Sequence, residues 1–202
     1  LATTAGQGPR KPNQLPLFPL GTVLFPGGRL SLRIFEPRYL DLIRDCTRSS
    51  SGFGVCLILE GSEVGAPAVP AALGCEAKVI DFSTTKDGLL GIVVRGARRF
   101  HVEKTKVRDN GLIVADVAWL PEPPSPRIQP EHQLLATLLA RILDKADEAY
   151  DKGGLEDAEW VGWRLAEWLP LMAHDRQRLL QENDPHRRLQ QIVERLPEFQ
   201  AD

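Results

Sequence analysis

Alternation of apolar and polar residues first marks a strand near the start of the chain. An apolar stretch interrupted by prolines occupies 15–25 and ends at the Pro-Gly-Gly break of 26–28. Residues 30–35 then place leucine and isoleucine at every second position, and this period of two predicts a β-strand. From Pro37 to Cys46 the apolar residues recur at helical spacing, and a proline suits the first turn of a helix. A strand followed directly by an amphipathic helix is therefore predicted here.

The chain continues with β-type patterns as far as about residue 120. Residues 55–59 are apolar at every position, which predicts a strand buried on both faces. Over 75–82 the apolar phase slips by one residue, and this slip predicts a β-bulge near Val79-Ile80. The turn sequences at 84–88 and 109–111 both carry the glycine that a tight hairpin favours. Together these patterns predict a mainly antiparallel sheet that closes into a barrel.

Residues 99–102 predict which side chains face into this barrel. Because a strand alternates its faces, Phe100 and Val102 should point inward, and Arg99 and His101 should point outward. Arg99 belongs to the densest basic run of the chain, which consists of Arg95, Arg98, Arg99, Lys104, Lys106 and Arg108. We interpret this run as a solvated strand face, with RNA binding as the alternative. Few aromatic side chains lie near it to stack on bases, so nucleic acid is not the favoured partner.

The period changes from strand to helix after a stretch rich in proline. Residues 121–130 contain five prolines, which favour an extended connection. We therefore predict a flexible lead over 1–13, a β-rich subdomain over 14–120, a linker over 121–130 and a helical subdomain over 131–202. Four helices are expected in the last part: one from about 134 that ends at Gly153-Gly154, one over 157–169, one over 174–182, and one over 185–196 with Asp184 as its N-cap.

Composition narrows the class of protein. The 202 residues are 43% apolar and carry a net charge of −2, so no dominant polyanionic partner is indicated. Residues up to 120 carry a net +4 and the rest a net −6, which favours docking of one part on the other. Cys46, Cys56 and Cys75 are widely spaced in apolar surroundings, as is typical of reduced core thiols in a cytoplasmic protein. No window predicts a membrane span, and no ligand spacing predicts a metal or cofactor site.

The motif searches give no catalytic constellation. The chain has no G-x-x-x-x-G-K-[ST] phosphate loop, no G-x-S-x-G elbow and no H-E-x-x-H. Its histidines are scattered. Glu36 beside Arg33 or Arg38 can be interpreted as an acid–base set, but a helix start with flanking ion pairs is the favoured interpretation. The sequence therefore predicts a protein that is not an enzyme.

Four segments carry a family resemblance. They are LPLFPLGTVLFPGGRLSLRIFEPRY, GFGVCLILEGSEVG, DGLLGIVVRGARRFHV, and WVGWRLAEWLPL with LLQENDPHRRLQQIV. Together they resemble the N-terminal, substrate-binding domain of the ATP-dependent Lon protease in its small stand-alone bacterial form, over about residues 14–196. The resemblance implies an α+β fold in which a mainly antiparallel pseudo-barrel, related to PUA folds, precedes a helical subdomain. It implies neither the ATPase nor the Ser–Lys peptidase domain of a full Lon.

The same resemblance implies a binding function. The expected partner is an unfolded polypeptide or another protein, bound without catalysis and without a cofactor. Such binding requires an exposed apolar strip or a free sheet edge. The candidates for the strip are Leu17, Phe18, Phe25, Trp160 and Trp163, together with the loop of 61–73. The alternatives are a small-molecule-binding or hydrolytic barrel, for which a deep pocket with convergent polar groups would argue, and an RNA-binding PUA-like module.

Overall fold

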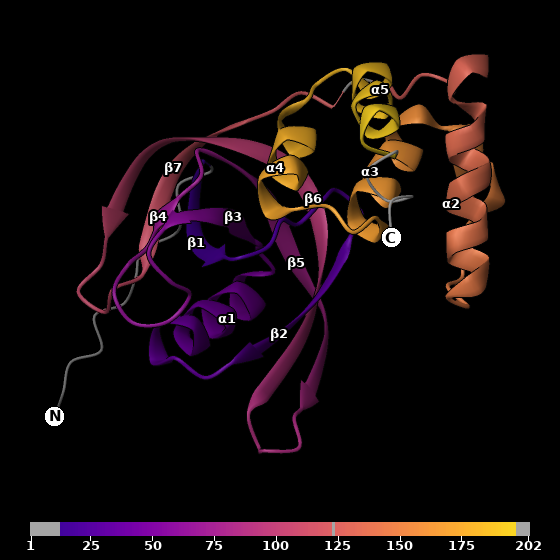
Figure 1. The fold of residues 1–202 in the computed structure, drawn as a ribbon. Coiled ribbons are helices and arrows are strands. Elements are labelled where there is room, and N and C mark those ends of the chain that lie inside the picture. The colour runs from indigo at the N-terminus through magenta and orange to yellow at the C-terminus, as the bar shows by residue number, and fades with distance from the viewer. Residues whose placement is uncertain (1–12, 123, 197–202) are drawn as a thin grey trace, which may run out of the picture.

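A ring of hydrogen-bonded strands forms the first part of the molecule. We describe residues 13–122 and 124–196 of a computed structural model. The ring runs in the order β1 (Gln14–Leu20), β7 (Ile113–Trp119), β6 (Leu90–Val107), β5 (Leu73–Thr84) and β3 (Phe53–Glu60). Parallel pairing of β3 with β1 closes it, and its other pairs are antiparallel. The expected antiparallel pseudo-barrel is therefore confirmed, with one parallel pair at its closure (Figure 1).

Two further strands extend this sheet. β4 (Val69–Pro70) pairs briefly with β3, and β2 (Arg29–Ile34) pairs with the first part of β6. The β5–β6 hairpin projects away from the barrel beyond β2 (Figure 1). The register between β5 and β6 shifts between Val79 and Asp81, where the slip in the sequence pattern predicted a bulge.

Helix α1 (Pro37–Ser49) follows β2 directly, as predicted. Its apolar face, with Tyr39, Leu42, Ile43 and Cys46, is buried against Phe18 and other side chains of the sheet. Arg38 is also buried, and its guanidinium donates to the carbonyl of Gly111 and pairs with Glu36 at 3.0 Å. Helix α1 is thus tied to the end of the second hairpin as well as to the barrel.

The remaining helices lie together beside one end of the barrel (Figure 1). They are α2 (Gln133–Lys145), α3 (Ala158–Trp168), α4 (Ala173–Gln181) and α5 (Pro185–Arg195), with short 3₁₀ turns at Pro130–His132 and Lys152–Glu156. The bounds of the last three agree with the predicted ones within one or two residues. Asp184 caps α5 as predicted, since its carboxylate accepts from the N–H groups of His186 and Arg187.

The predicted end of the first of these helices is wrong. Helix α2 stops at Lys145 rather than at Gly153-Gly154, which lie inside the following 3₁₀ turn. Asp147 adopts the left-handed conformation with φ 54°, and the Glu148 N–H returns to the Leu143 carbonyl. This is the geometry of a Schellman ending, in which asparagine or aspartate occasionally replaces the usual glycine. Aspartate in that role gives no signal in the sequence.

Side chains from the helices hold the barrel at several points. Gln177 of α4 donates to the Leu73 carbonyl at 2.9 Å, and Arg164 of α3 donates to the carbonyls of Pro26 and Gly27. A common hydrophobic cluster includes Phe25 from the barrel side and Trp163 from α3. Among the described residues, no helix is long and apolar enough to cross a bilayer.

The connection between the two parts is bonded to the start of α3. Within 124–130, Ile128 N–H donates to the Glu156 carbonyl, and the Ser125 hydroxyl donates to the Asp157 carboxylate at 2.6 Å. All named strands precede this stretch, and α2 to α5 follow it. We therefore propose the division into 14–120, 121–130 and 131–202 as a working one. The predicted lead lies outside the described residues, apart from Asn13.

Replacing Asp157 with alanine should both weaken α3 and release this connection. Its carboxylate also caps α3, accepting from the Trp160 N–H at 2.7 Å. Loss of an N-cap costs about 1–2 kcal/mol of stability, and loss of the Ser125 contact should speed tryptic cleavage after Arg127. Ser125→Ala is the control, because it removes the tether and keeps the Asp157 carboxylate cap, although the Glu159 N–H then loses the Ser125 hydroxyl as its acceptor. Urea unfolding and timed proteolysis measure the two effects, and equal stability of both variants would contradict the capping role.

Candidate functional site

The side chains predicted to form an apolar binding strip are mostly in the core. Leu17, Phe18, Phe25 and Trp163 are each 5% exposed or less, and Trp160 is half-buried. Strand β1 pairs on both edges, with β7 and with β3, so it has no free edge, and its side chains Leu17 and Phe18 are buried in hydrophobic clusters. Phe25 and Trp163 pack on each other, with ring centroids 5.8 Å apart, where barrel and helices meet. Phe18 lines the groove described below, and Trp160 lines the polar cleft described below. Leu17, Phe25 and Trp163 offer no free surface.

Most of the basic run is exposed, as its sequence predicts, but Arg99 is not. Arg99 does point away from Phe100, but it is buried beneath the helices, where it donates to the Leu180 carbonyl at 2.8 Å. The expectation of a solvated Arg99 is therefore wrong. Arg98 lies over the ring of Trp119 at 3.8 Å and pairs with Glu76. These contacts divide the run, so it does not form one continuous basic surface.

Strand β2 has an open edge. Among the described residues it pairs only with β6, and the N–H of Gly96 donates to the carbonyl of Gly28 just before the strand begins. Because ladder bonds alternate along an antiparallel pair, Leu30, Leu32 and Ile34 bond to β6. The backbone groups of Arg29, Ser31 and Arg33 then point outward. Nothing in the sequence marks this edge, because the alternation of apolar and polar residues within one strand does not show which neighbouring strands are absent.

The first position of this edge is already occupied. The N–H of Arg29 donates to the Glu167 carboxylate at 3.0 Å, so α3 caps the edge at its beginning. The two outward positions that follow, Ser31 and Arg33, have no such cap from the described chain. Arg33 pairs by its side chain with Asp87 at the tip of the β5–β6 hairpin. A strand bound here would therefore begin beyond Arg29 and run toward Phe35.

A groove of about 410 Å³ lies beside this edge, at the start of α1, and its lining combines apolar side chains with Ser31, Arg33, Glu36 and Glu63. Its floor contains Phe18 stacked on Tyr39, with ring centroids 3.8 Å apart and planes within 9°. Phe35 and Val64 rise at its sides and are 50% and 54% exposed. Glu63 fixes the loop that carries Val64, since its carboxylate accepts from the Gly21 N–H at 2.6 Å. Burial raises the pKa of Tyr39, which keeps its hydroxyl neutral in this groove.

A second groove runs along α1. It has a volume of about 370 Å³ and lies between α1 and the β5–β6 hairpin. Ile43 and Leu90 form its inner wall, and Phe82, which is 49% exposed, forms its outer wall. Leu90 is the cross-strand partner of Ile34, which immediately precedes Phe35. The two grooves are thus neighbours on the face of the barrel that carries α1.

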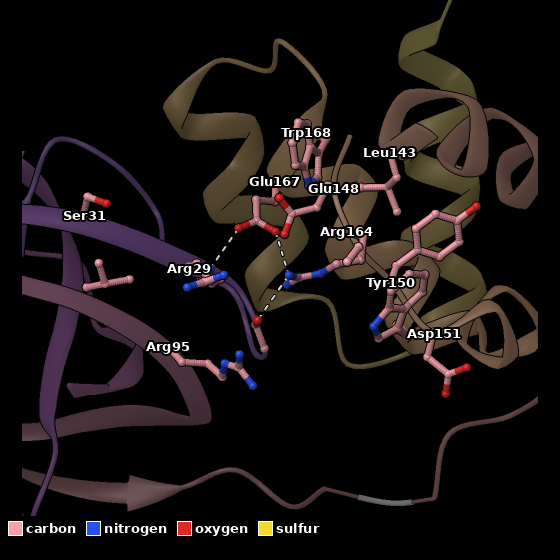
Figure 2. Close-up of a pocket in the computed structure, with 14 residues that line it drawn as sticks. Arg29, Ser31, Arg95, Leu143, Glu148, Tyr150, Asp151, Arg164, Glu167 and Trp168 are labelled. Atoms are coloured by element: carbon pink, nitrogen blue, oxygen red, sulfur yellow. Dashed lines mark hydrogen bonds and ion pairs between the residues drawn. The ribbon is translucent and has the colours of Figure 1, made fainter. Parts of the chain in front are cut away.

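A polar cleft of about 550 Å³ lies toward the beginning of β2, between the barrel and the helices. Figure 2 shows Arg29 and Arg95 on the strand side, and Tyr150, Asp151 and Trp168 on the helical side. Arg164 donates from α3 to the turn before β2 and pairs with Glu167 at 2.7 Å. Burial lowers the pKa of Arg164, and Arg95 lowers it further by repulsion. Positive charge is thus concentrated at the strand side of this cleft.

The described residues provide little for catalysis or metal binding. The cysteines are buried and no disulfide joins them, and burial raises the pKa of Cys56 to about 12 and that of Cys75 further still. Thiols of this kind are poor nucleophiles near neutral pH. Within the described ranges, no three or more histidine, cysteine or acidic side chains gather closely enough to hold a metal ion. Glu36 and Arg38 form the ion pair expected at a helix start.

Similar structures support the fold independently. A Lon N-terminal domain protein from Xanthomonas campestris is 52% identical, with a TM-score of 0.77 over 89% of this chain and 96% of that one. The N-terminal domain of the Lon protease from the Mycobacterium avium complex is 18% identical, with a TM-score of 0.67 over 90% of this chain and 96% of that one. The second likeness concerns the fold alone.

Sequence comparison agrees with the structural likeness. A Lon protease from Methylocella silvestris is 28% identical over 104 residues, which are 51% of this chain and 13% of that protein. The present chain therefore matches only a small part of that relative. The family described as the substrate-binding domain of the ATP-dependent protease La (Lon) matches residues 14–198. We conclude that the chain belongs to the family of Lon substrate-binding domains.

Proposed function

We propose that this protein binds extended segments of polypeptide, without catalysis, at the open edge of β2 and in the groove beside it. The observation that carries the proposal is the position of this groove, with Phe35 and Val64 exposed, directly next to a strand edge that lacks a partner in the described chain. The substrate-binding description of the family supports the same class of ligand.

Strand addition explains how such a site would bind many sequences. Backbone groups of an added strand pair with the edge whatever its side chains are, and adjacent pockets select some of those side chains. Proteins normally protect long open edges against pairing with other chains. Among the described residues, the backbone of this edge is capped only at Arg29, by Glu167, and the exposed apolar residues begin at its other end. An unfolded segment rich in apolar residues would satisfy both features.

The rival functions have weaker support. A small-molecule or hydrolytic site would need reactive groups in the polar cleft, yet its polar side chains are arginines, carboxylates, Ser31, Tyr150 and two tryptophans, and no histidine or lysine of the described chain lines it as a base for the serine. An RNA-binding surface would need the basic run to be accessible. Arg99 is buried and Arg98 is already engaged by Glu76 and Trp119, so that surface is reduced.

Substitution in the groove should weaken binding of an unfolded protein. A fluorescently labelled, reduced and carboxymethylated α-lactalbumin is a suitable probe, because it cannot refold. We expect the double variant Phe35→Ser/Val64→Ser to bind it about tenfold or more weakly in fluorescence anisotropy, as the loss of two apolar contacts predicts. The control is Leu134→Ser/Met172→Ser, since these residues are 81% and 67% exposed on other parts of the molecule.

A proline at position 31 tests the contribution of the open edge through its backbone. The Ser31 N–H points outward, so Ser31→Pro removes a donor from the open edge and keeps the bonds to β6. We expect this variant to lose affinity as well, with an unchanged thermal midpoint. Equal affinity of the groove variant, the control and the unchanged protein would refute the site. Loss of affinity only in the control would place binding on the helical side.

A further inference from the structure

The polar cleft contains an arrangement that folding alone does not favour. Arg29 and Arg95 are direct cross-strand partners on β2 and β6, so their side chains leave the same face of the sheet next to each other. Like charges in this relation destabilise a sheet. We propose that the cleft is a carboxylate-binding subsite of the polypeptide site, in which Arg29 and Arg95 hold an acidic side chain of the bound segment; this inference rests on the proposed function.

Both guanidinium groups are available for a ligand. In the described chain, neither forms an ion pair with a carboxylate within 4 Å, although both line the cleft. The one interaction that Figure 2 draws for Arg29 joins its backbone N–H to Glu167, and none is drawn for Arg95. The third arginine, Arg164, is engaged by Glu167 and by the Gly27 carbonyl. Arginine presents its donors as a planar fork that matches a carboxylate, so a pair of such forks recognises an acidic group strongly.

The acidic residues of the cleft are engaged or lie across from these arginines. Glu167 is bound by Arg164 and by the Arg29 N–H, and Asp151 accepts from the Gly153 N–H at 3.0 Å. Glu148 enters from the connection after α2, on the helical side. A ligand carboxylate would therefore bind at the strand side of the cleft. Replacing Glu148 with glutamine removes a negative charge that competes with the ligand carboxylate for the arginines, so this substitution should strengthen binding of the ligand.

The position of the cleft relative to the groove sets a spacing for the ligand. Ser31 lines both, and Arg29, Ser31, Arg33 and Phe35 share the outer face of β2 and of its extension. A segment that pairs with the edge at Ser31 and Arg33 can continue past this pairing toward the Arg29 side chain, and the distance from Phe35 to Arg29 corresponds to about six residues, or about 20 Å. The preferred segment would therefore carry an apolar anchor and a carboxylate about six residues apart.

Labelled peptides of about twelve residues test this subsite on the whole 202-residue chain. Each carries a Phe-Leu anchor and, about six positions before or after it, either Glu-Glu or Gln-Gln. We expect one of the two glutamate peptides to bind about tenfold more tightly than its glutamine counterpart at low salt. This difference should disappear in Arg29→Gln/Arg95→Gln and persist in the control Arg141→Gln, which changes an exposed arginine of α2 outside the cleft. Glu148→Gln should enlarge it.

Failure of the subsite and failure of the function give different results. Equal binding of glutamate and glutamine peptides overturns the subsite and leaves the polypeptide site standing. Absence of binding by every peptide overturns both. Inorganic phosphate at about 1 mM should leave the advantage of the glutamate peptide unchanged; if it removes that advantage, the cleft is a site for free anions and the proposal is wrong. An unchanged advantage in the double arginine variant would also overturn it.

Discussion

Replacing Phe100 with alanine should lower the free energy of unfolding by about 3–5 kcal/mol, because burial is lost and a cavity remains. The ring is fully buried and contacts Trp119 edge-on, with centroids 6.1 Å apart. Two glycines make room for it: a Cβ on Gly54 would lie 2.6 Å from the tip of the ring, and one on Gly74 would lie 2.8 Å from it. Because β3 and β5 carry glycine next to the ring, they have no side chains that could fill the cavity left by Phe100→Ala.

Phe82→Ala is the matched control for this substitution. Phe82 lies on the neighbouring strand of the same hairpin, but its side chain is 49% exposed. We expect this variant to lose less than about 1 kcal/mol, since an exposed ring gives up little burial. Urea-induced unfolding followed by circular dichroism measures both variants. A similar loss in the two would mean that Phe100 is not a core residue of the barrel.

Local patterns in the sequence were sufficient to predict most of the secondary structure. The bulge near Val79, the hairpin turns and the start of α3 each depend on a few neighbouring residues whose backbone preferences are strong. The inward direction of Phe100 follows from strand alternation in the same way. The Schellman ending of α2 was missed because Asp147 replaces the usual glycine. In this chain, therefore, the reliable predictions are those that involve contacts close in sequence.

The candidate site depends on contacts between distant segments, and the sequence does not reveal them. Alternation places Arg99 on the outer face of β6, but only the structure shows that α4 covers this face. Leu17 and Phe25 are apolar and early in the chain, which fits either a core or an exposed strip. The open edge of β2 and the pairing of Arg29 with Arg95 require knowledge of strand order. The resemblance identified the fold correctly, whereas the site at Phe35 and its neighbours is our proposal from the described structure.

Replacing Arg188 with alanine should cost about as much as the loss of Phe100. This arginine is fully buried, with its guanidinium 3.3 Å above the ring of Trp163. It donates to the carbonyls of Leu179 and Glu182, at the C-terminal end of α4, and Arg99 donates to the Leu180 carbonyl between them. The last carbonyls of a helix have no partners within it and carry partial negative charge. The two arginines therefore supply the missing donors, and Arg99 does so from the barrel.

The pKa of Arg188 shows that this contact has a cost. Burial, together with repulsion from Arg99, lowers its pKa to about 9, so the group is still charged at pH 7. Because the unfolded chain binds more protons than the folded one once the pH rises above 9, this penalty is fully present at neutral pH and is relieved only above pH 9. The carbonyl bonds and the indole ring must offset it. Removing the guanidinium leaves buried carbonyls without donors, which makes the truncation expensive.

We expect Arg188→Ala to lower the free energy of unfolding by about 3–5 kcal/mol, as the loss of one partner in a buried charged contact does. Arg187→Ala, which changes the exposed neighbour, should cost less than about 0.5 kcal/mol. Arg188→Lys should recover only part of the loss, because an ammonium group lacks the planar fork that reaches both carbonyls. Arg99→Ala should lose about 1–3 kcal/mol, far more than a solvated arginine would. Urea unfolding measures all four variants, and full recovery by lysine would show that charge alone, rather than the geometry of the donors, holds α4 against the barrel.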